Sequence, residues 1–309
     1  MKPIRRLAFV INADKAGAPE VARQLIDLAK SVGAETIETT EFPQPENFLN
    51  GCDACCVIGG DGTMLGVARE AARLQVPLLG VNRGSLGFLT TFTADEARAE
   101  LPGILAGDYR LASRVMLACT IGGGQPDTAL NDVLVKDEVN SRLVHLALYA
   151  DDEFVAEYAC DGLIFSTSTG STAYNLSAGG PLIQPDAGVI AMTPICPHTL
   201  SNRTIVFRQE VRLRIENRSA PARLLVALDG RSHLVNDTGA SVEIALAPQR
   251  LPLIQSRDHA HFDVVRRKLG WSGGFTVVDV TDEGYRIRRQ SDGSVLPAWF
   301  PREQLRPSC

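Results

Sequence analysis

The stretch Val57–Gly66, VIGGDGTMLG, determines how the first part of the chain is expected to fold. An apolar run over 54–58 ends at the pair Gly59-Gly60, and an amphipathic segment over 63–75 follows at once. Apolar residues at three- and four-residue steps predict that this segment is a helix. Strand, glycine-rich turn and helix in this order place residues 59–63 where open α/β sheets bind their ligands.

The flanking sequence repeats the alternation of strand and helix. Strand-like runs over 5–12, 54–60 and 76–82 alternate with helical patterns over 19–34, 63–75 and 94–109, the last of which Pro102 is expected to kink or interrupt. Such alternation predicts a parallel sheet covered by helices on both faces. From about residue 112 the pattern changes to many short strand-like runs separated by turn residues, which is typical of an all-β domain.

The fold class predicted from these patterns is α/β, with a Rossmann-like parallel-sheet domain followed by an all-β domain. A helical pattern over 257–271, with Phe262, Val265 and Leu269 on one face, precedes a short strand-rich tail with a turn at 291–294. The expected organisation is an α/β domain over 1–112, a β-rich domain over 113–256, a helix over 257–272 that returns to the first domain, and a small β-like extension over 273–309.

Composition narrows the class of protein. The chain has 309 residues, of which 45% are hydrophobic and 22% are charged, as in globular proteins. A net charge of -5 without a long basic run argues against nucleic acid or an anionic membrane as a general partner. No apolar run is long enough to span a membrane, so a cytoplasmic location is expected. The seven cysteines are odd in number and lie in mostly apolar sequence, so they are expected to be buried thiols rather than disulfides. Cys52 and Cys55 have the spacing of a zinc or redox pair, but they too are expected to be buried side chains.

Asp61 is the unexpected residue of the glycine-rich turn. Glycines let backbone N–H groups approach an anion, and the helix N-terminus adds partial positive charge, so Gly59, Gly60 and Thr63 are predicted to bind phosphate. A carboxylate repels phosphate and therefore needs another role. It could ligate Mg²⁺ on the phosphates or accept the proton of an attacking hydroxyl, and both roles fit phosphoryl transfer to an alcohol. The remaining alternative is a tight turn with a helix-capping Asp.

A second long motif covers 161–183. Its centre, STSTGSTAYNLSAGG over 166–180, is rich in hydroxyl groups and glycines that can bind ribose and phosphate without a net charge. Tyr174 offers an aromatic face for a base, and Asp161 an acceptor for an exocyclic amine or a ribose hydroxyl. The alternative is a polar turn before a short helix over 173–178.

Six segments together resemble the NAD kinases in order and spacing, over roughly residues 5–272. They are GGDGT (59–63), NRGSLGF (82–88), LND (130–132), DGLIFSTSTGSTAYNLSAGGP (161–181), TPICPHTLSNR (193–203) and LGW (269–271). The resemblance implies an NAD site between the two domains. It also implies transfer of the terminal phosphoryl group of ATP, or of inorganic polyphosphate, to the adenosine ribose 2′-hydroxyl of NAD. The expected cofactor is a divalent cation, Mg²⁺, held mainly through substrate phosphates, and the expected assembly is a homodimer or homotetramer whose subunits complete each other's sites.

The resemblance also carries residue roles to this chain. It makes Asp61 the general base. The NAD-binding residues that it implies are Gly62, Phe88, Asn131, Asp132, Arg142, Asp161, Thr172, Ala173, Tyr174, Asn175, Ser177 and Arg231. For Arg142, a solvated strand residue is an equal alternative, and a structural role is expected for His198. His259 and His261, two residues apart, are a poor pair of metal ligands.

Four positions depart from the family pattern. Asp132 stands where many relatives have Glu, and Ala159 where relatives often have Arg or another polar residue. Ser168 stands in place of Pro and is expected to loosen its loop. Arg231 replaces a common Gln, and its guanidinium could meet a phosphate and change NAD affinity or NADP inhibition. Two alternatives stay open beside NAD kinase. One is a lipid or sphingoid kinase, which would share GGDGT, and the other is a catalytically weak NAD(P)-sensing protein, which the changes at Ala159, Ser168 and Arg231 make plausible.

Overall fold

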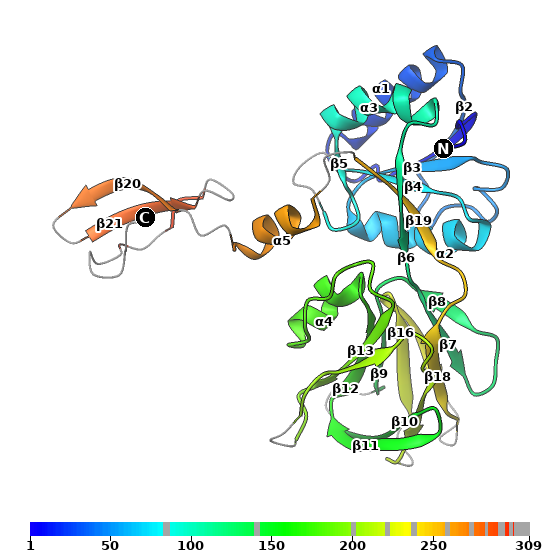
Figure 1. The fold of residues 1–309 in the computed structure, drawn as a ribbon, viewed down its shortest axis with the longest axis vertical. Coiled ribbons are helices and arrows are strands. Elements are labelled where there is room, and N and C mark those ends of the chain that lie inside the picture. The colour runs from blue at the N-terminus through cyan, green and yellow to red at the C-terminus, as the bar shows by residue number, and fades with distance from the viewer. Residues whose placement is uncertain are drawn as a thin grey trace.

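The computed structural model describes residues 1–82, 87–138, 143–198, 202–219, 223–235, 240–256, 260–271, 275–281, 284–289, 294–296 and 299. Two domains are stacked along the long axis of the molecule, and a small hairpin lies to one side of them (Figure 1). The first domain is α/β and the second consists mainly of antiparallel sheets, which confirms the predicted fold class.

The sheet of the first domain has seven strands in the order β2-β1-β3-β4-β19-β6, with β5 paired to β4. All pairs are parallel except β19 with β6. Every residue of β3 and β4 is buried, as expected for strands covered on both faces. The strands are β1 (Arg6–Ile11), β2 (Glu35–Thr39), β3 (Ala54–Ile58), β4 (Leu78–Asn82), β5 (Phe92–Thr93), β6 (Arg110–Arg114) and β19 (Leu251–Gln255).

Three helices cover this sheet. α1 (Ala18–Ser31) and α3 (Ala94–Leu105) share one hydrophobic cluster with one face of the sheet, whereas α2 (Asp61–Leu74) packs in a second cluster on the other face. The helix that follows β1 therefore covers one face of the sheet, and the helix that follows β3 covers the opposite face. The carboxyl ends of these adjacent strands form the kind of crevice at which α/β sheets bind ligands.

Helix α3 is not interrupted at Pro102, which was one of the two effects expected of this proline. The helix continues past Pro102 to Leu105 and ends one turn later than an interruption at the proline would require. Leu101, Ile104 and Leu105 are buried, and their packing on the sheet holds this last turn in place.

Strand β19 corrects one predicted assignment. The sequence-based division places 251–255 in the β-rich domain, but β19 pairs with β4 and β6 of the first sheet. β6 likewise ends at Arg114, two residues past the predicted boundary. The two chain crossings between the domains therefore run side by side, as adjacent antiparallel strands (Figure 1).

The second domain contains two six-stranded sheets, in the orders β11-β10-β15-β18-β7-β8 and β14-β13-β12-β9-β16-β17. Apolar residues from both sheets form one core, including Val133, Leu146, Phe165 and Ile244. The strands are β7 (Leu117–Ile121), β8 (Asp127–Ala129), β9 (Asp132–Asp137), β10 (Val144–Ala150), β11 (Glu153–Cys160), β12 (Gly162–Thr167), β13 (Val189–Ile195), β14 (Ile205–Arg208), β15 (Leu213–Asn217), β16 (Leu224–Leu228), β17 (Arg231–Val235) and β18 (Val242–Leu246).

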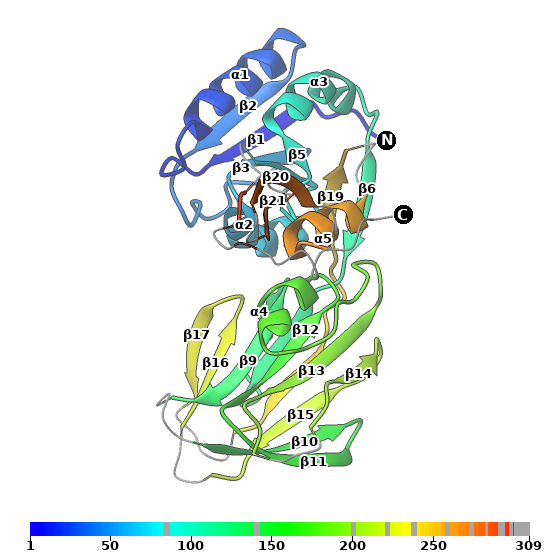
Figure 2. The ribbon, with the colours of Figure 1, turned by 90° about the vertical axis from the view of Figure 1, so that its left-hand side faces the viewer.

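A short helical segment joins β12 to β13 at the end of this domain that faces the first domain (Figure 2). It consists of the 3-10 turn η1 (Gly170–Thr172) and helix α4 (Tyr174–Ser177), which confirms the predicted short helix.

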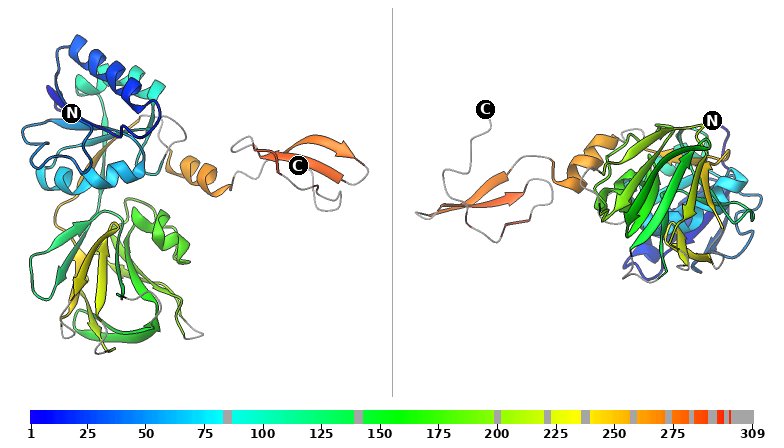
Figure 3. Two further views of the ribbon diagram at one scale, coloured as in Figure 1. Left: turned by 180° about the vertical axis from the view of Figure 1, so that it is seen from behind. Right: turned by 90° about the horizontal axis from the view of Figure 1, so that it is seen from below.

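The C-terminal part begins with α5 (His261–Leu269) and continues into the hairpin of β20 (Phe275–Thr281) and β21 (Gly284–Arg289). The hairpin stands apart from both domains in two views (Figure 3). Val264 and Val265 are buried on α5, whereas Phe262 is 58% exposed, so the predicted apolar face of the helix is only partly covered. The predicted turn at 291–294 lies largely outside the described residues.

The cysteines of the CDACC stretch belong to the core. Cys55 and Cys56 lie in β3 with no exposed surface, and burial raises the pKa of both thiols. They are therefore small buried side chains, as predicted. In the part of the chain that the structure describes, no helix combines the length and the apolar character that crossing a membrane requires.

Candidate active site

Asp61 is the first residue of α2, and its carboxylate points at the loop that follows β4. Oδ2 accepts the N–H of Phe88 at 2.8 Å. Oδ1 accepts the N–H groups of Leu89 and Thr90 at 3.1 and 3.0 Å, and the Thr90 hydroxyl at 3.1 Å. The carboxylate is thus held in one orientation by four donors from a single loop, which we call the Asp61 cradle (residues 88–90).

The cradle leaves one acceptor position open. An ionised carboxylate offers about four acceptor positions, two on each oxygen. Oδ1 receives three donors and Oδ2 only one among the described residues. Oδ2 can therefore accept one more hydrogen bond. Gly87 makes this close approach possible, because a Cβ there would overlap both the Asp61 carboxylate and the Thr90 hydroxyl.

The glycine pair before Asp61 is shaped by Thr63. The Thr63 side chain is 95% buried, its hydroxyl accepts the Nδ2–H of Asn12 at 3.2 Å, and a Cβ on Gly59 would overlap it. The Thr63 side chain therefore fills the space beneath the first turn of α2, next to Gly59. Gly62, by contrast, has open space where a Cβ would lie. Of the three predicted phosphate-binding residues, Gly60 has the freest surroundings, because its nearest neighbour in the Cβ direction is Lys15 Nζ at 3.6 Å.

Lys15 is a site residue that the sequence reasoning missed. Its Nζ donates to the Gly59 carbonyl at 3.0 Å and to Asn82 Oδ1 at 2.7 Å. The Asn82 amide lies 3.5 Å from the Thr90 hydroxyl, which in turn donates to Asp61. A polar chain therefore runs from Lys15 to the cradle. The only sequence signal for it was a lysine shortly after the first predicted strand.

The segment Leu130–Asp132 from the β-rich domain is held by Asp229, which the sequence reasoning treated only as part of a turn. The Asp229 carboxylate accepts the N–H groups of Leu130, Asn131 and Asp132 at 2.7, 2.8 and 3.1 Å. Asp229 has a φ of 47°, which an Asp before Gly in a tight turn tolerates. The turn between β16 and β17 therefore fixes the backbone on which the predicted NAD-binding pair sits.

Asp132 and Asp229 form a buried pair of carboxyl groups. Burial first, and then the neighbouring charge of Asp229, raise the pKa of Asp132 to about 7. Burial also raises the pKa of Asp229, although its three amide donors and Arg231 oppose the shift. Asp132 is 8% exposed, so a negative charge on it lacks much of the hydration it would have in water. This carboxyl therefore changes charge near neutral pH.

Most hydroxyl groups of the 166–180 segment bind the protein itself. Ser166, Thr167, Ser168 and Ser171 are fully buried, and each donates to a backbone carbonyl. Ser168 donates to the Pro185 carbonyl at 3.1 Å, so the structure does not support the expectation that it loosens the loop. These four side chains therefore hold the loop, and they are not available to bind ribose or phosphate as the sequence suggested.

Asn175 also lies inside this loop. Its side chain has no exposed surface, accepts the Thr193 hydroxyl at 2.7 Å and donates to the Pro181 carbonyl at 3.2 Å. Around it, the other predicted NAD-binding residues of the loop reach the surface: Thr172 and Ala173 are half-buried, and Tyr174 and Ser177 are exposed. The structure thus separates a buried residue that holds the loop from half-buried and exposed residues on the same segment, whose helix α4 lies at the end of the β-rich domain nearest the first domain (Figure 2).

Asp161 is not brought to this place within one chain. It precedes β12, whereas the hydroxyl-rich loop follows it, and the six residues of β12 span roughly 20 Å at about 3.3 Å per residue. Asp161 is exposed and hydrogen bonded to the Cys196 thiol, which raises the pKa of Cys196. His198 donates its N–H to Ala159 at this same far end, at 2.9 Å. Arg142 and His259 lie outside the described residues.

Arg231 takes part in a contact between the domains. Its guanidinium donates to Asp127 Oδ2 and to the Thr128 carbonyl, both at 2.9 Å, while Arg69 of α2 binds the other oxygen of Asp127 at 3.0 Å. These residues line a pocket of about 1100 Å³ between α2 and the β-rich domain, which also reaches Gly62. Asp61, Phe88 and Tyr174 do not line it. Arg231 and the carboxylate face of Asp61 therefore border different spaces.

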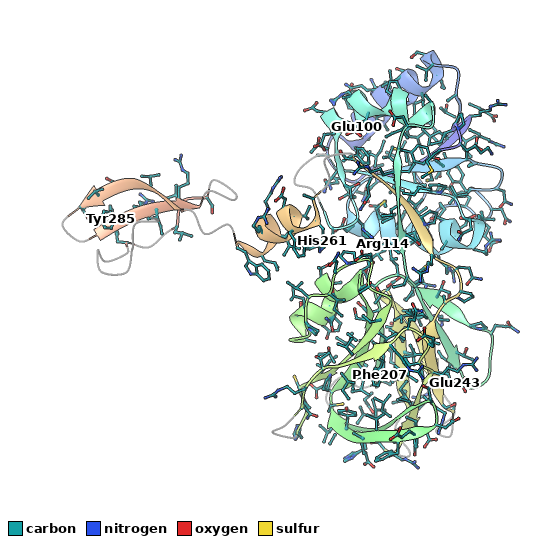
Figure 4. All side chains as sticks on the ribbon, in the orientation of Figure 1. Glu100, Arg114, Phe207, Glu243, His261 and Tyr285 are labelled. Atoms are coloured by element: carbon teal, nitrogen blue, oxygen red, sulfur yellow. The ribbon has the colours of Figure 1, made fainter. Side chains whose placement is uncertain are left out.

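Helix α5 begins beside the cradle. The rings of His261 and Phe88 are 6.5 Å apart, and Figure 4 shows His261 on α5 near Arg114 of β6, between the two domains. Burial lowers the pKa of His261, the charge of Arg114 lowers it further, and Asp186 opposes them. Phe88 therefore contacts Asp61 through its backbone N–H and lies near His261 of α5 through its ring.

The described side chains around Asp61 provide few ligands for a metal ion. Among the described residues, no three His, Cys, Asp or Glu side chains lie close enough to bind one together. The Asp61 oxygens already accept four hydrogen bonds. This arrangement suits a cation such as Mg²⁺ that keeps its waters and is bound chiefly through substrate phosphates, because Mg²⁺ sites often use only one or two carboxylates.

Two family models match the chain. Residues 33–109 match the ATP-NAD kinase N-terminal domain, and residues 130–256 match the ATP-NAD kinase C-terminal domain. The chain is 45% identical over 226 residues to an NAD kinase of Azotobacter vinelandii, covering 71% of this chain and 76% of the relative. It is 43% identical to an NAD kinase of Pseudomonas aeruginosa, with the same coverage.

Solved structures of NAD kinases have the same fold. A yeast NADH kinase complexed with NADH superposes with a TM-score of 0.79 at 22% identity, covering 90% of this chain and 91% of the other. An NAD kinase from Archaeoglobus fulgidus in complex with ATP superposes with a TM-score of 0.71 at 24% identity, covering 86% and 97%. Together, the family models and the close relatives show that the chain belongs to the NAD kinase family.

Proposed function

We propose that this NAD kinase transfers the terminal phosphoryl group of ATP or polyphosphate to the adenosine ribose 2′-hydroxyl of NAD, with Asp61 as the general base. The observation that carries the proposal is the open acceptor position on Asp61 Oδ2, in a carboxylate otherwise held by four donors. A carboxylate fixed in this way is oriented before the substrate arrives, which is what a positioned base requires.

The reaction balances with these groups. The ribose 2′-hydroxyl donates a hydrogen bond to Oδ2 and loses its proton to that oxygen as its own oxygen attacks phosphorus. The new O–P bond forms while the bond to the leaving phosphate oxygen breaks, and the remaining diphosphate or shortened polyphosphate departs. Backbone N–H groups near Gly59 and Gly60 and the N-terminus of α2 favour the negative charge of the transferring group.

We assign the acceptor, NAD, to the surface between the cradle and α4. Phe88 and Gly62 come from the first domain, and Asn131, Asp132, Thr172, Ala173, Tyr174 and Ser177 from the second. The exposed Tyr174 ring is available to stack on a base. Because its side chain is buried and satisfied by the protein, we assign Asn175 the role of holding the loop.

A divalent cation, Mg²⁺, completes the proposal. When bound to the donor phosphates it would neutralise part of their charge, and the residues of this chain nearest to them would be Gly59, Gly60 and Thr63. The described residues fit this role because they leave the cation to the phosphates rather than enclosing it.

The position of Asp161 supports a shared site in a homodimer or homotetramer. A strand's length separates Asp161 from the hydroxyl-rich loop of its own chain, yet Asp161 is exposed. If Asp161 binds NAD, as the family resemblance implies, a second copy must present it.

The test is an assay of NADP formation from NAD and of NADPH formation from NADH, with ATP or polyphosphate as donor, with and without Mg²⁺. NADH is included as an acceptor because the yeast neighbour is complexed with NADH, and ATP as a donor because the archaeal neighbour is in complex with ATP. We expect NADP with at least one donor, only in the presence of the cation. Absence of product in every combination would favour an NAD(P)-sensing role instead.

A further inference from the structure

Lys15 occupies the crevice at the carboxyl ends of the central strands. It follows β1, and its Nζ binds the Gly59 carbonyl, just after β3, and the Asn82 side chain at the end of β4. β1 and β3 are the neighbours whose following helices go to opposite faces of the sheet. The ammonium group therefore stands where an open α/β sheet receives its ligand.

Among the residues that the structure describes, no acidic side chain pairs with the charge of Lys15. Both oxygens that it contacts are neutral, one a peptide carbonyl and one a side-chain amide. No ion pair in the described ranges includes Lys15, although most of the pairs that are present join exposed surface residues. A half-buried ammonium group that is held by neutral oxygens still attracts an anion, and it has three donors of which two are used.

The position of the Lys15 ammonium group suits binding of the phosphoryl donor, ATP or polyphosphate, rather than of the acceptor NAD. Nζ lies on the open side of Gly60, 3.6 Å from where a Cβ would be, so the glycine leaves the approach to the ammonium group clear. Asp61 follows Gly60 directly, and the chain through Asn82 and Thr90 ties Lys15 to the Asp61 cradle. A phosphate bound at Lys15 would therefore lie beside the base that activates the attacking hydroxyl.

We infer that Lys15 binds the terminal phosphates of the phosphoryl donor, so that a polyphosphate chain is recognised by this lysine as well as by the glycine-rich turn. This inference rests on the proposed function. A lysine ammonium is a suitable point charge for phosphate, and its charge also offsets that developing on the transferring group and the leaving phosphate. Lys15 thus contributes to donor affinity and to the transfer step, and Asp61 to acceptor activation.

The experiment compares an analogue of the phosphoryl donor with AMP, which lacks its terminal phosphates, and with the acceptor NAD. Binding of β,γ-methylene-ATP, AMP and NAD is measured by calorimetry for the unmodified enzyme, Lys15→Gln and Lys15→Arg. Glutamine keeps a neutral donor for Gly59, and arginine keeps the charge. Lys30→Gln, an exposed lysine in the last turn of α1, is the matched control. We expect Lys15→Gln to weaken the methylene-ATP complex by at least about tenfold, with AMP and NAD changed by less than about twofold, because a charged hydrogen bond to phosphate is lost.

Three results would overturn the inference: unchanged methylene-ATP affinity in Lys15→Gln, an equal loss for all three ligands, or a Lys15→Arg variant as weak as Lys15→Gln. A second measurement needs no variant. Lys15 is half-buried and reachable by an amine-acylating reagent, so methylene-ATP should protect it from labelling while NAD should not. Equal labelling with and without methylene-ATP would also contradict the assignment. Failure of the proposed function is distinguishable, because it appears as absence of NADP formation by the unmodified enzyme.

Discussion

The Asp61 carboxylate accepts the backbone N–H of Phe88 at 2.8 Å, so the proposed base is hydrogen bonded to the main chain of the aromatic residue predicted to line the NAD pocket. A displacement of the loop that carries Phe88 displaces the base as well. The 88–90 cradle thereby links the geometry of the pocket to the reactivity of Asp61.

Asp61→Asn tests the base directly. Loss of a positioned general base lowers kcat by about 10² to 10⁴-fold. The amide also turns an NH₂ group toward at least one backbone donor of the cradle, so the free energy of unfolding should fall by about 1–3 kcal/mol. Steady-state kinetics and urea unfolding check both effects, with Asp27→Asn on the exposed face of α1 as control. A variant that keeps near-normal kcat would remove Asp61 from the mechanism.

Alanine at the two glycines around Asp61 should lower activity in both cases but change stability in opposite directions. Gly62→Ala has open space for its Cβ and lies in a helix, where alanine adds about 0.5–1 kcal/mol of stability. Activity should still fall, because the methyl group enters the side from which the substrates approach. Gly87→Ala should lose both stability and activity, since its Cβ overlaps the Asp61 carboxylate. Melting temperature and kcat/KM measured together distinguish the two cases, and full activity in Gly62→Ala would contradict a close approach there.

Asp132 predicts a pH dependence of stability. Its folded-state pKa, raised to about 7 from an ordinary value of 3.8, means that folding favours the protonated form. The folded state therefore loses stability as pH rises between these two values. Asp132→Asn removes this loss, so its stability relative to the unmodified enzyme should increase by about 2 kcal/mol between pH 5 and pH 8. Urea unfolding at the two pH values measures it, and a difference that does not change with pH would show that Asp132 titrates normally.

Asp161 can be tested by mixing inactive subunits. If a partner completes each site, a dimer of one Asp61→Asn chain and one Asp161→Ala chain contains one intact site. Random reassociation of equal amounts should then restore about one quarter of the normal activity, because about half of the dimers are mixed and half of their sites are intact. Refolding the two variants together and separately gives the comparison. No recovery on mixing would place Asp161 in the site of its own chain or outside any site.

Arg231→Gln tests whether this departure from the family pattern changes nucleotide binding. The guanidinium is bound to Asp127 and Thr128, and an exposed ion pair of this kind contributes only about 0–1 kcal/mol to stability. The melting temperature should therefore change little, while the affinities for NAD and NADP change relative to each other if a phosphate reaches this pocket. Fluorescence titration with both nucleotides measures this, and two unchanged affinities would end the hypothesis.

The local parts of the fold could be predicted because short-range patterns determine them. The apolar run before Gly59 and the helical spacing after it identify β3 and α2, and the turn residues identify most strands of the second domain. β19 could not be placed in the same way. Its apolar sequence does not name its partners β4 and β6, which lie far away in the chain.

The site shows the same division. Asp61 was found because a carboxylate in a glycine-rich turn conflicts with phosphate binding. Asp229 was missed because its function depends on three N–H groups nearly a hundred positions earlier. Lys15 was missed because a single lysine after a strand is common, and only the contact with Gly59 and Asn82 distinguishes it.

The place of β19 between β4 and β6 sets the order in which a nascent chain can finish folding. β6 emerges from the ribosome before the entire β-rich domain, and β19 emerges after it. Until then β4 and β6 present unpaired edges, the kind of surface that favours wrong pairing or aggregation. The first domain, although it comes first in the sequence, is therefore completed last, and the β-rich domain folds while its neighbour is still open.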